Sequence, residues 1–307
     1  VKILEDMGVS EDWFFKIQAD HLENLRSITA SAFSIARFLN HHNIGGPIAL
    51  HRLFSQCRLL QLDYRADRFL RSVVESVILR ELRLLKHKAR IPVKKGITLF
   101  GIMDETGLLE ENEVYVTFDT MNGKHSPPPG SGRLLVTRSP ALHDGDIQFA
   151  YNVIPPKGHP LRSHRNCIAF SKKGKRDLPS QLSGGDLDGD LYNIIWDPEV
   201  QPVRTFAPAD YPRVDPVNIG RAVKVEDMAD FFVEFMRTDQ LGVIATRHMI
   251  LADQMEEGTS HPACKKLAEL HSTAVDFSKT GRAVQMGVLP MVKYNNFRPD
   301  LYVAPSF

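Results

Sequence analysis

Cysteine is scarce in this sequence, and long apolar runs are absent. Cys57, Cys167 and Cys264 lie far apart and form no CxxC pair, so we expect neither a disulfide framework nor a cysteine-rich zinc site. No charged-then-apolar leader opens the chain, and no apolar run approaches the ~18 residues of a membrane span. These absences predict a reducing intracellular compartment, nucleus or cytoplasm, and no membrane segment.

Net charge is also small, because 38 Lys and Arg oppose 37 Asp and Glu. The total therefore identifies no partner, but basic residues gather in two segments, which contain Arg80, Arg83, Lys86, Lys88, Arg90, Lys94 and Lys95, and Lys172, Lys173, Lys175 and Arg176. Such clusters are as compatible with a polyanionic partner as with solvated surfaces. The 307 residues allow two lobes. The start at Val1 rather than Met suggests a segment of a longer protein.

An acidic loop, Ser183-Gly184-Gly185-Asp186-Leu187-Asp188-Gly189-Asp190, lies directly before the apolar run Leu191 to Trp196. Its three carboxylates stand at every second position, among glycines that permit a tight turn. Close carboxylates repel one another unless a cation binds or their pKa values rise. Hard cations prefer oxygen ligands, so the loop predicts a site for Mg²⁺, with Mn²⁺ or Ca²⁺ as alternatives.

Two other interpretations of the acidic loop fit less well. An EF-hand would place Asp186, Asp188 and Asp190 at positions one, three and five, but its glycine at position six is replaced by Leu191. A plain surface turn is disfavoured because an apolar run follows at once, where three unpaired charges would be costly to bury. His261, Cys264 and His271 match no zinc spacing, and Cys264 and His271 are expected as a packed core pair on one helical face.

The periodicity of apolar residues divides the chain into three parts. Residues 1–90 have helical spacing, with one helix from Ser10 to Leu39, a second over 47–60 and a third over 67–88 with Phe69, Val73, Val77 and Leu84 on one side. Six short strands follow, at 97–100, 113–118, 133–137, 147–151, 167–170 and 191–196, without room for helices between them. Helical spacing resumes over 226–256, where Gly242 could mark a bend, and over 261–277. The expected fold class is α+β, with a small closed barrel.

Several ordered motifs resemble those of one family. The acidic loop with Leu191-Tyr192, preceded by Leu135-Val136-Thr137-Arg138-Ser139-Pro140-Ala141-Leu142-His143, closely resembles the cellular RNA-dependent RNA polymerases of eukaryotic RNA silencing. Further matches are Arg90 to Gly96, Asp104 to Gly107, Met236 to Asp239 and Leu270 to Phe277. Two of these motifs, Arg138-Ser139-Pro140-Ala141-Leu142-His143 and Asp186-Leu187-Asp188-Gly189-Asp190, are also remotely similar to the large catalytic subunit of DNA-directed RNA polymerases. The resemblance covers nearly the whole chain.

The resemblance implies a double-psi β-barrel of about six strands, flanked by helical segments. It divides the chain into a helical lobe (1–90), the barrel with the catalytic loop (91–200), and a connector with cleft-lining helices (201–307). It implies that Asp186, Asp188 and Asp190 hold Mg²⁺ and are catalytic, and that a second ion arrives with the nucleoside triphosphate. The reaction would be attack of an RNA 3′-hydroxyl on the α-phosphate, with release of pyrophosphate, to make double-stranded RNA for gene silencing.

The resemblance also implies substrate contacts. Arg138 would select ribose through the 2′-hydroxyl, Lys94 and Lys95 would contact phosphates, and Gly185 and Gly189 would allow close approach. The expected partners are RNA template and product strands, nucleoside triphosphates and small-RNA processing proteins. The helix from Met236 to Leu251 would line the cleft.

The sequence differs from the family in two ways: one residue departs from the family pattern, and one of the family's two barrels is not predicted in it. Asp144 stands where the family commonly has proline, a change in a turn that should spare the barrel. Family members build their site from two barrels, whereas residues 1–90 read as helical, so autonomous activity of this chain stays open. The alternative function is a metal-dependent RNA-binding module without activity of its own.

Overall fold

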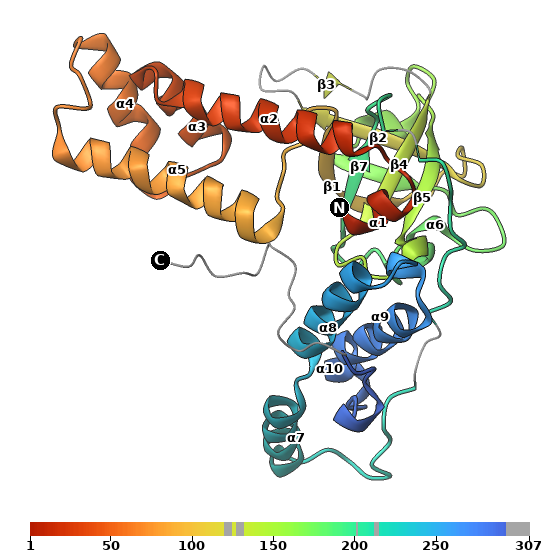
Figure 1. The fold of residues 1–307 in the computed structure, drawn as a ribbon. Coiled ribbons are helices and arrows are strands. Elements are labelled where there is room, and N and C mark those ends of the chain that lie inside the picture. Colours follow the sequence, from red (N-terminus) through yellow and green to blue (C-terminus); the bar gives the residue numbers. More distant parts are fainter. Residues whose placement is uncertain (120–124, 127–131, 201, 212–214, 293–307) are drawn as a thin grey trace. The chain divides into compact units, whose positions relative to one another are not determined.

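The computed structural model describes residues 1–119, 125–126, 132–200, 202–211 and 215–292, which form two units (Figure 1). The helical unit is Glu11–Pro92, and the barrel unit joins Val1–Ser10 to the described residues from Val93 onward. The first ten residues include helix α1 (Lys2–Asp6). They belong to the barrel unit because the Asp6 carboxylate accepts hydrogen bonds from the Thr259 amide and hydroxyl, at 2.7 and 2.6 Å.

The helical unit contains four α-helices: α2 (Glu11–Ile28), α3 (Ala32–His41), α4 (Leu50–Leu59) and α5 (Arg68–Lys88). The single helix expected from Ser10 to Leu39 is wrong, because the chain breaks after Ile28. Ser31 starts the next helix, since its hydroxyl accepts a hydrogen bond from the Ser34 amide at 3.1 Å. The serine is a capping signal, but apolar residues continue at helical spacing on both sides of it, and so the break was missed.

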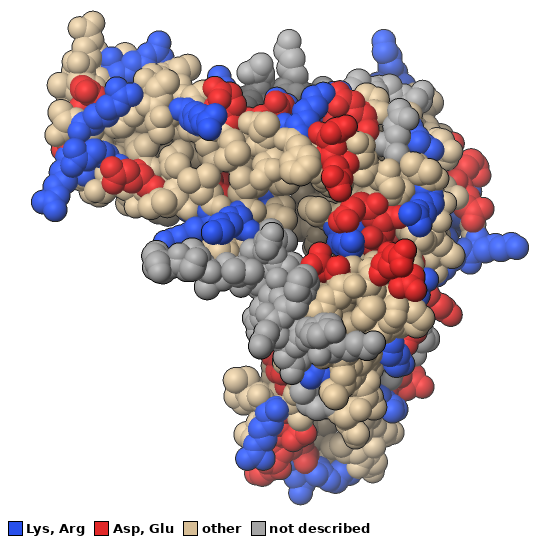
Figure 2. Space-filling view, viewed as in Figure 1, with Lys and Arg blue, Asp and Glu red and all other residues tan. Residues whose placement is uncertain are grey.

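Helix α5 buries a different side from the one expected. Its buried residues are Val74, Val77, Glu81 and Leu85, whereas Phe69 is 58% exposed. The two sets share only Val77. Lys and Arg outnumber Asp and Glu in this unit, and Figure 2 shows their side chains along its outer surface.

The barrel contains all six expected strands: β1 (Gly96–Met103), β2 (Glu113–Asp119), β4 (Arg133–Arg138), β5 (Ile147–Asn152), β6 (Cys167–Phe170) and β7 (Leu191–Ile195). Their order is β2-β5-β4-β7-β1-β6, and the pairing of β2 with β6 closes the ring. The pairs β1–β6 and β2–β5 are parallel and the others antiparallel. A two-residue strand β3 (His125–Ser126) pairs with β2. The predicted fold class, a double-psi β-barrel with flanking helices, is confirmed.

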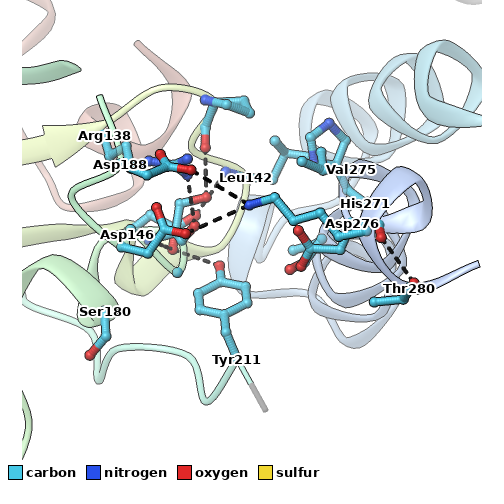
Figure 3. Close-up of a pocket in the computed structure, with 18 of the residues that line it drawn as sticks. Arg138, Leu142, Asp146, Ser180, Asp188, Tyr211, His271, Val275, Asp276 and Thr280 are labelled. Atoms are coloured by element: carbon cyan, nitrogen blue, oxygen red, sulfur yellow. Dashed lines mark hydrogen bonds and ion pairs between the residues drawn. The ribbon is translucent and has the colours of Figure 1, made fainter. Parts of the chain in front are cut away.

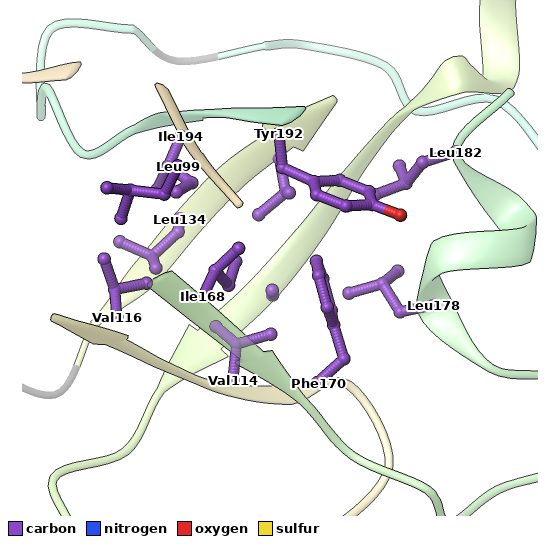
Figure 4. Packing of buried hydrophobic residues seen from close by; sticks show 12 residues of the cluster. Leu99, Val114, Val116, Leu134, Ile168, Phe170, Leu178, Leu182, Tyr192 and Ile194 are labelled. Atoms are coloured by element: carbon purple, nitrogen blue, oxygen red, sulfur yellow. The ribbon is translucent and has the colours of Figure 1, made fainter. Parts of the chain in front are cut away.

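The barrel interior is filled by apolar side chains, including Val114, Ile168, Phe170, Tyr192 and Ile194 (Figure 4). Each fully buried side chain of this size stabilises the fold by about 1.5–3 kcal/mol relative to an exposed one. Strand β7 contributes Tyr192 and Ile194 to the interior and lies between β4 and β1. A slip of one residue would turn Tyr192 outward, so the register of β7 fixes where the acidic loop ends.

Helices make up the rest of the barrel unit: α6 (Leu178–Gln181), α7 (Val225–Thr238), α8 (Leu241–Gln254), α9 (Pro262–Val275) and α10 (Phe277–Thr280). The 3-10 turns of the chain are η1 (Gly46–Ile48), η2 (Asp144–Asp146), η3 (Pro160–Ser163), η4 (Gly258–Ser260) and η5 (Met286–Val288). The helix expected over 226–256 is two helices, broken at Asp239–Gln240 rather than bent at Gly242, and α6 lies between strands where none was expected. Among the described residues, no helix combines the length and apolar character needed to cross a bilayer.

Candidate active site

The acidic loop leads into β7, as expected, and starts after α6, which was not expected. Its backbone is unusual. Four of its residues have positive φ: Ser183 (+54°), Gly184 (+66°), Leu187 (+61°) and Gly189 (+118°). A leucine in the left-handed region is strained and needs compensating contacts. Leu187 has them, because its side chain packs against the barrel core. This anchor turns the flanking carboxylates outward.

The three aspartates of the loop come together as a cluster. Asp186, Asp188 and Asp190 each offer a carboxylate oxygen, and these oxygens all lie within 4.8 Å of one another. The Asp186 and Asp188 side chains are 43% and 62% exposed, whereas Asp190 is 10% exposed. Burial acts to raise the pKa of Asp186, but contacts with Asp188 and the charges of Lys279 and Arg138 outweigh it and lower that pKa. Asp186 is therefore ionised at neutral pH.

Arg138 holds both ends of the acidic loop. It is the last residue of β4 and pairs in register with Tyr192 of β7. Its Nη2 lies 2.7 Å from Oδ1 of Asp190, and its Nη1 donates to the Ser183 carbonyl at 3.0 Å. Burial acts to lower the pKa of Arg138, but its bond to Asp190 raises it. The guanidinium is thus a fixed, permanent charge beside the cluster.

A second cation reaches the cluster from the C-terminal helices. The Lys279 ammonium on α10 lies 3.6 Å from Oδ2 of Asp186 and 3.7 Å from Oδ2 of Asp188. Lys279 is 63% exposed. The sequence analysis did not identify it, although it lies only two residues beyond the matching motif that ends at Phe277.

A second acidic turn, Asp144-Gly145-Asp146 (η2), is hydrogen-bonded to the start of the acidic loop. The buried Asp146 carboxylate accepts four hydrogen bonds, from the Leu142 and His143 amides (both 2.9 Å), the Ser183 amide (3.1 Å) and the Tyr211 hydroxyl (2.7 Å). Burial raises the pKa of Asp146. The sequence analysis missed this anchor and treated the segment only as a turn.

Asp144 of the same turn joins the barrel to the helices. It is fully buried and accepts a hydrogen bond from Ser260 at 2.8 Å, and the Lys265 ammonium lies 3.1 Å from the same oxygen. Burial acts to raise its pKa, but contacts with His143, Ser260 and Lys265 lower it to about 2. Asp144 is therefore a link between two parts of this unit.

The cluster opens into a pocket of about 580 Å³ (Figure 3). Its lining includes Arg138, Asp146, Gly185, Asp186, Asp188 and Tyr211 from the barrel side, and His271, Ser272, Asp276 and Lys279 from the helices. Burial lowers the pKa of His271, so it is neutral at pH 7. The helical lining comes from α6, α9 and α10, and the segment Met236 to Leu251 is not among the residues that line this pocket.

Comparisons with known proteins place the chain in a family. The family model described as RNA dependent RNA polymerase matches residues 1–305. The chain belongs to the RNA-dependent RNA polymerase family. It is 33% identical over 300 residues to RNA-dependent RNA polymerase 2 of Arabidopsis thaliana, covering 92% of this chain and 26% of that protein. It is 34% identical over 328 residues to RNA-dependent RNA polymerase 6 of the same plant, covering all of this chain and 26% of that protein.

A solved structure supports the fold assignment. The RNA dependent RNA polymerase QDE-1 from Thielavia terrestris superimposes with a TM-score of 0.67 at 20% sequence identity, covering 93% of this chain and 35% of that one. The chain spans about a quarter of the length of the curated relatives in this family. The double-psi barrel expected for such polymerases is thus present in this segment.

Lys94 and Lys95, which were expected to contact phosphates, do not lie at the acidic cluster. Strand β1 runs antiparallel to β7, so the residues before β1 lie beside the far end of β7, and the Trp196 amide donates to the Lys95 carbonyl. The Lys95 ammonium lies 3.2 Å from Asp197. Five strand residues separate that end from the loop, about 17 Å. Contact between these lysines and RNA stays a prediction.

The two expected glycines differ in what they do. A Cβ added to Gly185 would lie 2.5 Å from the Tyr192 hydroxyl and 3.0 Å from the Pro179 carbonyl, so only glycine fits there. Gly189 has open space around it but a φ of +118°, which L side chains rarely adopt. Gly185 is required for packing and Gly189 for backbone conformation.

The donor set suits a hard divalent cation. Carboxylate oxygens are preferred ligands of Mg²⁺, and opposite oxygens around one such ion lie about 4.2 Å apart. The 4.8 Å spread of the three oxygens is slightly wider, and the exposure of Asp186 and Asp188 leaves room to close it. Within the described residues this is the one acidic, histidine or cysteine cluster with such spacing. Cys264 and His271 are buried core residues, as expected.

Proposed function

We propose that this chain carries the catalytic carboxylates of an RNA-dependent RNA polymerase. The reaction transfers a nucleoside monophosphate from a nucleoside triphosphate to an RNA 3′-hydroxyl, releases pyrophosphate and yields double-stranded RNA for gene silencing. The observation that carries the proposal is the convergence of the Asp186, Asp188 and Asp190 oxygens within 4.8 Å at the edge of a 580 Å³ pocket. Family membership supports it.

The three aspartates would hold Mg²⁺, with Mn²⁺ as a substitute. When bound there, the ion supplies Lewis acidity that favours the ionised 3′-hydroxyl and offsets charge on the phosphates. Asp190 is the most fixed ligand, because Arg138 and the Asp186 amide hold its two oxygens, at 2.7 and 3.1 Å. The side chains of Asp186 and Asp188 are exposed, which leaves space beside the ion for the reacting oxygens of the substrates.

Arg138 orients this site from the barrel side. Two of its donors are used within the acidic loop, at Asp190 and the Ser183 carbonyl. Its remaining face lines the pocket, where we propose that it hydrogen-bonds the ribose of the incoming nucleotide and selects the 2′-hydroxyl. Template RNA, product RNA and nucleoside triphosphates are the proposed partners, with small-RNA processing proteins beside them in the nucleus or the cytoplasm.

The alternative function is a metal-dependent RNA-binding module without activity of its own. The match to the polymerase family over residues 1–305 does not favour it. The acidic loop also retains every feature that metal-dependent transfer needs from it: three converging carboxylates, an adjacent arginine and an open pocket.

The test uses the protein encoded by the complete gene, with single-stranded RNA, Mg²⁺ and four nucleoside triphosphates. We expect template-length product from the wild type, and at least about a 10³-fold lower rate from Asp188→Ala, because the cluster loses a ligand of the ion. Glu110→Ala, an exposed carboxylate outside the pocket, is the matched control and should leave the rate unchanged. Equal rates for wild type and Asp188→Ala would refute the assignment, and binding of RNA without any incorporation would favour the binding module.

A further inference from the structure

The acidic cluster has two cationic neighbours that are held in opposite ways. Arg138 is 20% exposed and lies 2.7 Å from a 10% exposed Asp190, so this pair is short and shielded from water. Lys279 is 63% exposed and lies 3.6 and 3.7 Å from the two exposed aspartates. Those distances exceed a hydrogen bond and leave only electrostatic attraction. The Arg138–Asp190 contact is therefore expected to be stable, whereas breaking the Lys279 contacts should require little free energy.

The Lys279 ammonium lies beside two of the carboxylates that a divalent ion would use. Both of its contacts are to Oδ2 atoms, one from Asp186 and one from Asp188, and these residues supply two of the three carboxylates of the cluster. A divalent ion carries twice the charge and approaches to about 2.1 Å. It would therefore displace the ammonium at these oxygens.

The backbone of α10 is anchored, so displacement needs only side-chain movement. The Val217 amide donates to the Thr280 carbonyl, and the Thr280 amide donates to the Asp276 carbonyl, both at 2.8 Å. The Phe277 ring packs on Phe235 with centroids 5.6 Å apart. A lysine side chain is a flexible four-carbon stem, so the ammonium can move as a point charge while the backbone of α10 stays in place.

We infer that Lys279 is an exchangeable counter-ion of the carboxylate site, which competes with the divalent ion for Asp186 and Asp188, while Arg138 is the permanent one. The inference rests on the proposed function, because it takes the cluster to be the metal site. It assigns Lys279 a positioning role: it offsets repulsion between the two exposed carboxylates and yields them to the arriving ion.

The experiment titrates this chain with Mn²⁺ and follows free Mn²⁺ by electron paramagnetic resonance. Lys279→Met should bind Mn²⁺ about fivefold more tightly than the wild type, since exposed ion pairs are each worth up to roughly that factor. Lys279→Arg keeps the charge and should bind close to the wild type. Lys266→Met removes a lysine of similar exposure, 54%, that pairs with Glu269 instead, and should leave the affinity unchanged.

Unchanged or weaker Mn²⁺ binding by Lys279→Met would overturn the inference. If Asp188→Ala still lost Mn²⁺ binding in that case, the proposed metal site would stand without it. Tighter binding by Lys279→Met, together with no polymerisation by the complete protein, would support the counter-ion and refute the polymerase assignment. Equal Mn²⁺ binding by wild type and Asp188→Ala would overturn both.

Discussion

Two acidic turns lie close together in this unit and have opposite characters. In Asp144-Gly145-Asp146 both carboxylates are fully buried, and each contacts donors or cations from other segments. In Asp186-Leu187-Asp188 the carboxylates are exposed, face each other and meet a loosely held ammonium. Carboxylates that already accept hydrogen bonds from several segments hold the chain together, whereas carboxylates left facing one another are available to an ion.

The largest expected effect separates the turns by stability. Asp146→Ala leaves three amides and the Tyr211 hydroxyl without their acceptor, and we expect a loss of about 3–5 kcal/mol in the free energy of unfolding. Asp188→Ala should change that free energy by less than about 0.5 kcal/mol, because its side chain is 62% exposed. The measurement is urea denaturation followed by Trp196 fluorescence in a Trp13→Phe background, so that the signal comes from the barrel. Similar losses for the two variants would contradict the comparison.

A smaller effect concerns the glycine inside each turn or loop. Gly185→Ala places a Cβ 2.5 Å from the Tyr192 hydroxyl, and Gly145→Ala places one 2.1 Å from the Ala207 carbonyl. Both should lower the free energy of unfolding by about 1–3 kcal/mol through overpacking. Only Gly185→Ala should also weaken Mn²⁺ binding, because it displaces the acidic loop. If Gly145→Ala weakened Mn²⁺ binding as much, the two turns would not be separable.

The smallest effect is a dependence on pH. The pKa of Asp144 is lowered to about 2 in the folded protein, from an ordinary value of 3.8. Its contribution, about 2 kcal/mol, is therefore complete above pH 4 and is lost as pH falls toward 2. Asp144→Asn should be less stable than the wild type at pH 6, and the difference should shrink between pH 4 and 2. A difference that stays constant over this range would show that the charge of Asp144 does not stabilise the fold.

Local patterns in the sequence were enough to predict the barrel. Each strand is a short apolar run between turn residues, and all six were located within a few residues of their observed limits. The acidic loop was found because its three aspartates are neighbours in sequence, and the helix over 67–88 because its apolar residues have helical spacing. Its first residues are capped by Asp67, whose carboxylate accepts a hydrogen bond from the Leu70 amide. Breaks within long helical periods were missed at Thr29–Ser31 and at Asp239–Gln240, since apolar spacing continues across them.

Contacts between distant segments could not be predicted in this way. Lys279 reaches Asp186 from α10, and Asp146 reaches the Ser183 amide and Tyr211 from a turn that precedes both. Nothing in the spacing of these residues marks them as neighbours. The antiparallel pairing of β1 with β7, which spacing also does not reveal, places Lys94 and Lys95 beside the far end of β7, and their contact with RNA stays a prediction.

The pairing of β1 with β7 also constrains how the protein is made. Phe100 pairs with Leu191 and Gly96 with Ile195, so this pairing cannot form, and the barrel cannot close, until the last strand has been synthesised. Pairings this distant in sequence close slowly, whereas the helices of residues 11–92 need only near neighbours. We therefore expect nascent chains that end before Ile195 to contain a folded helical unit, an open barrel that is sensitive to proteases, and no metal site.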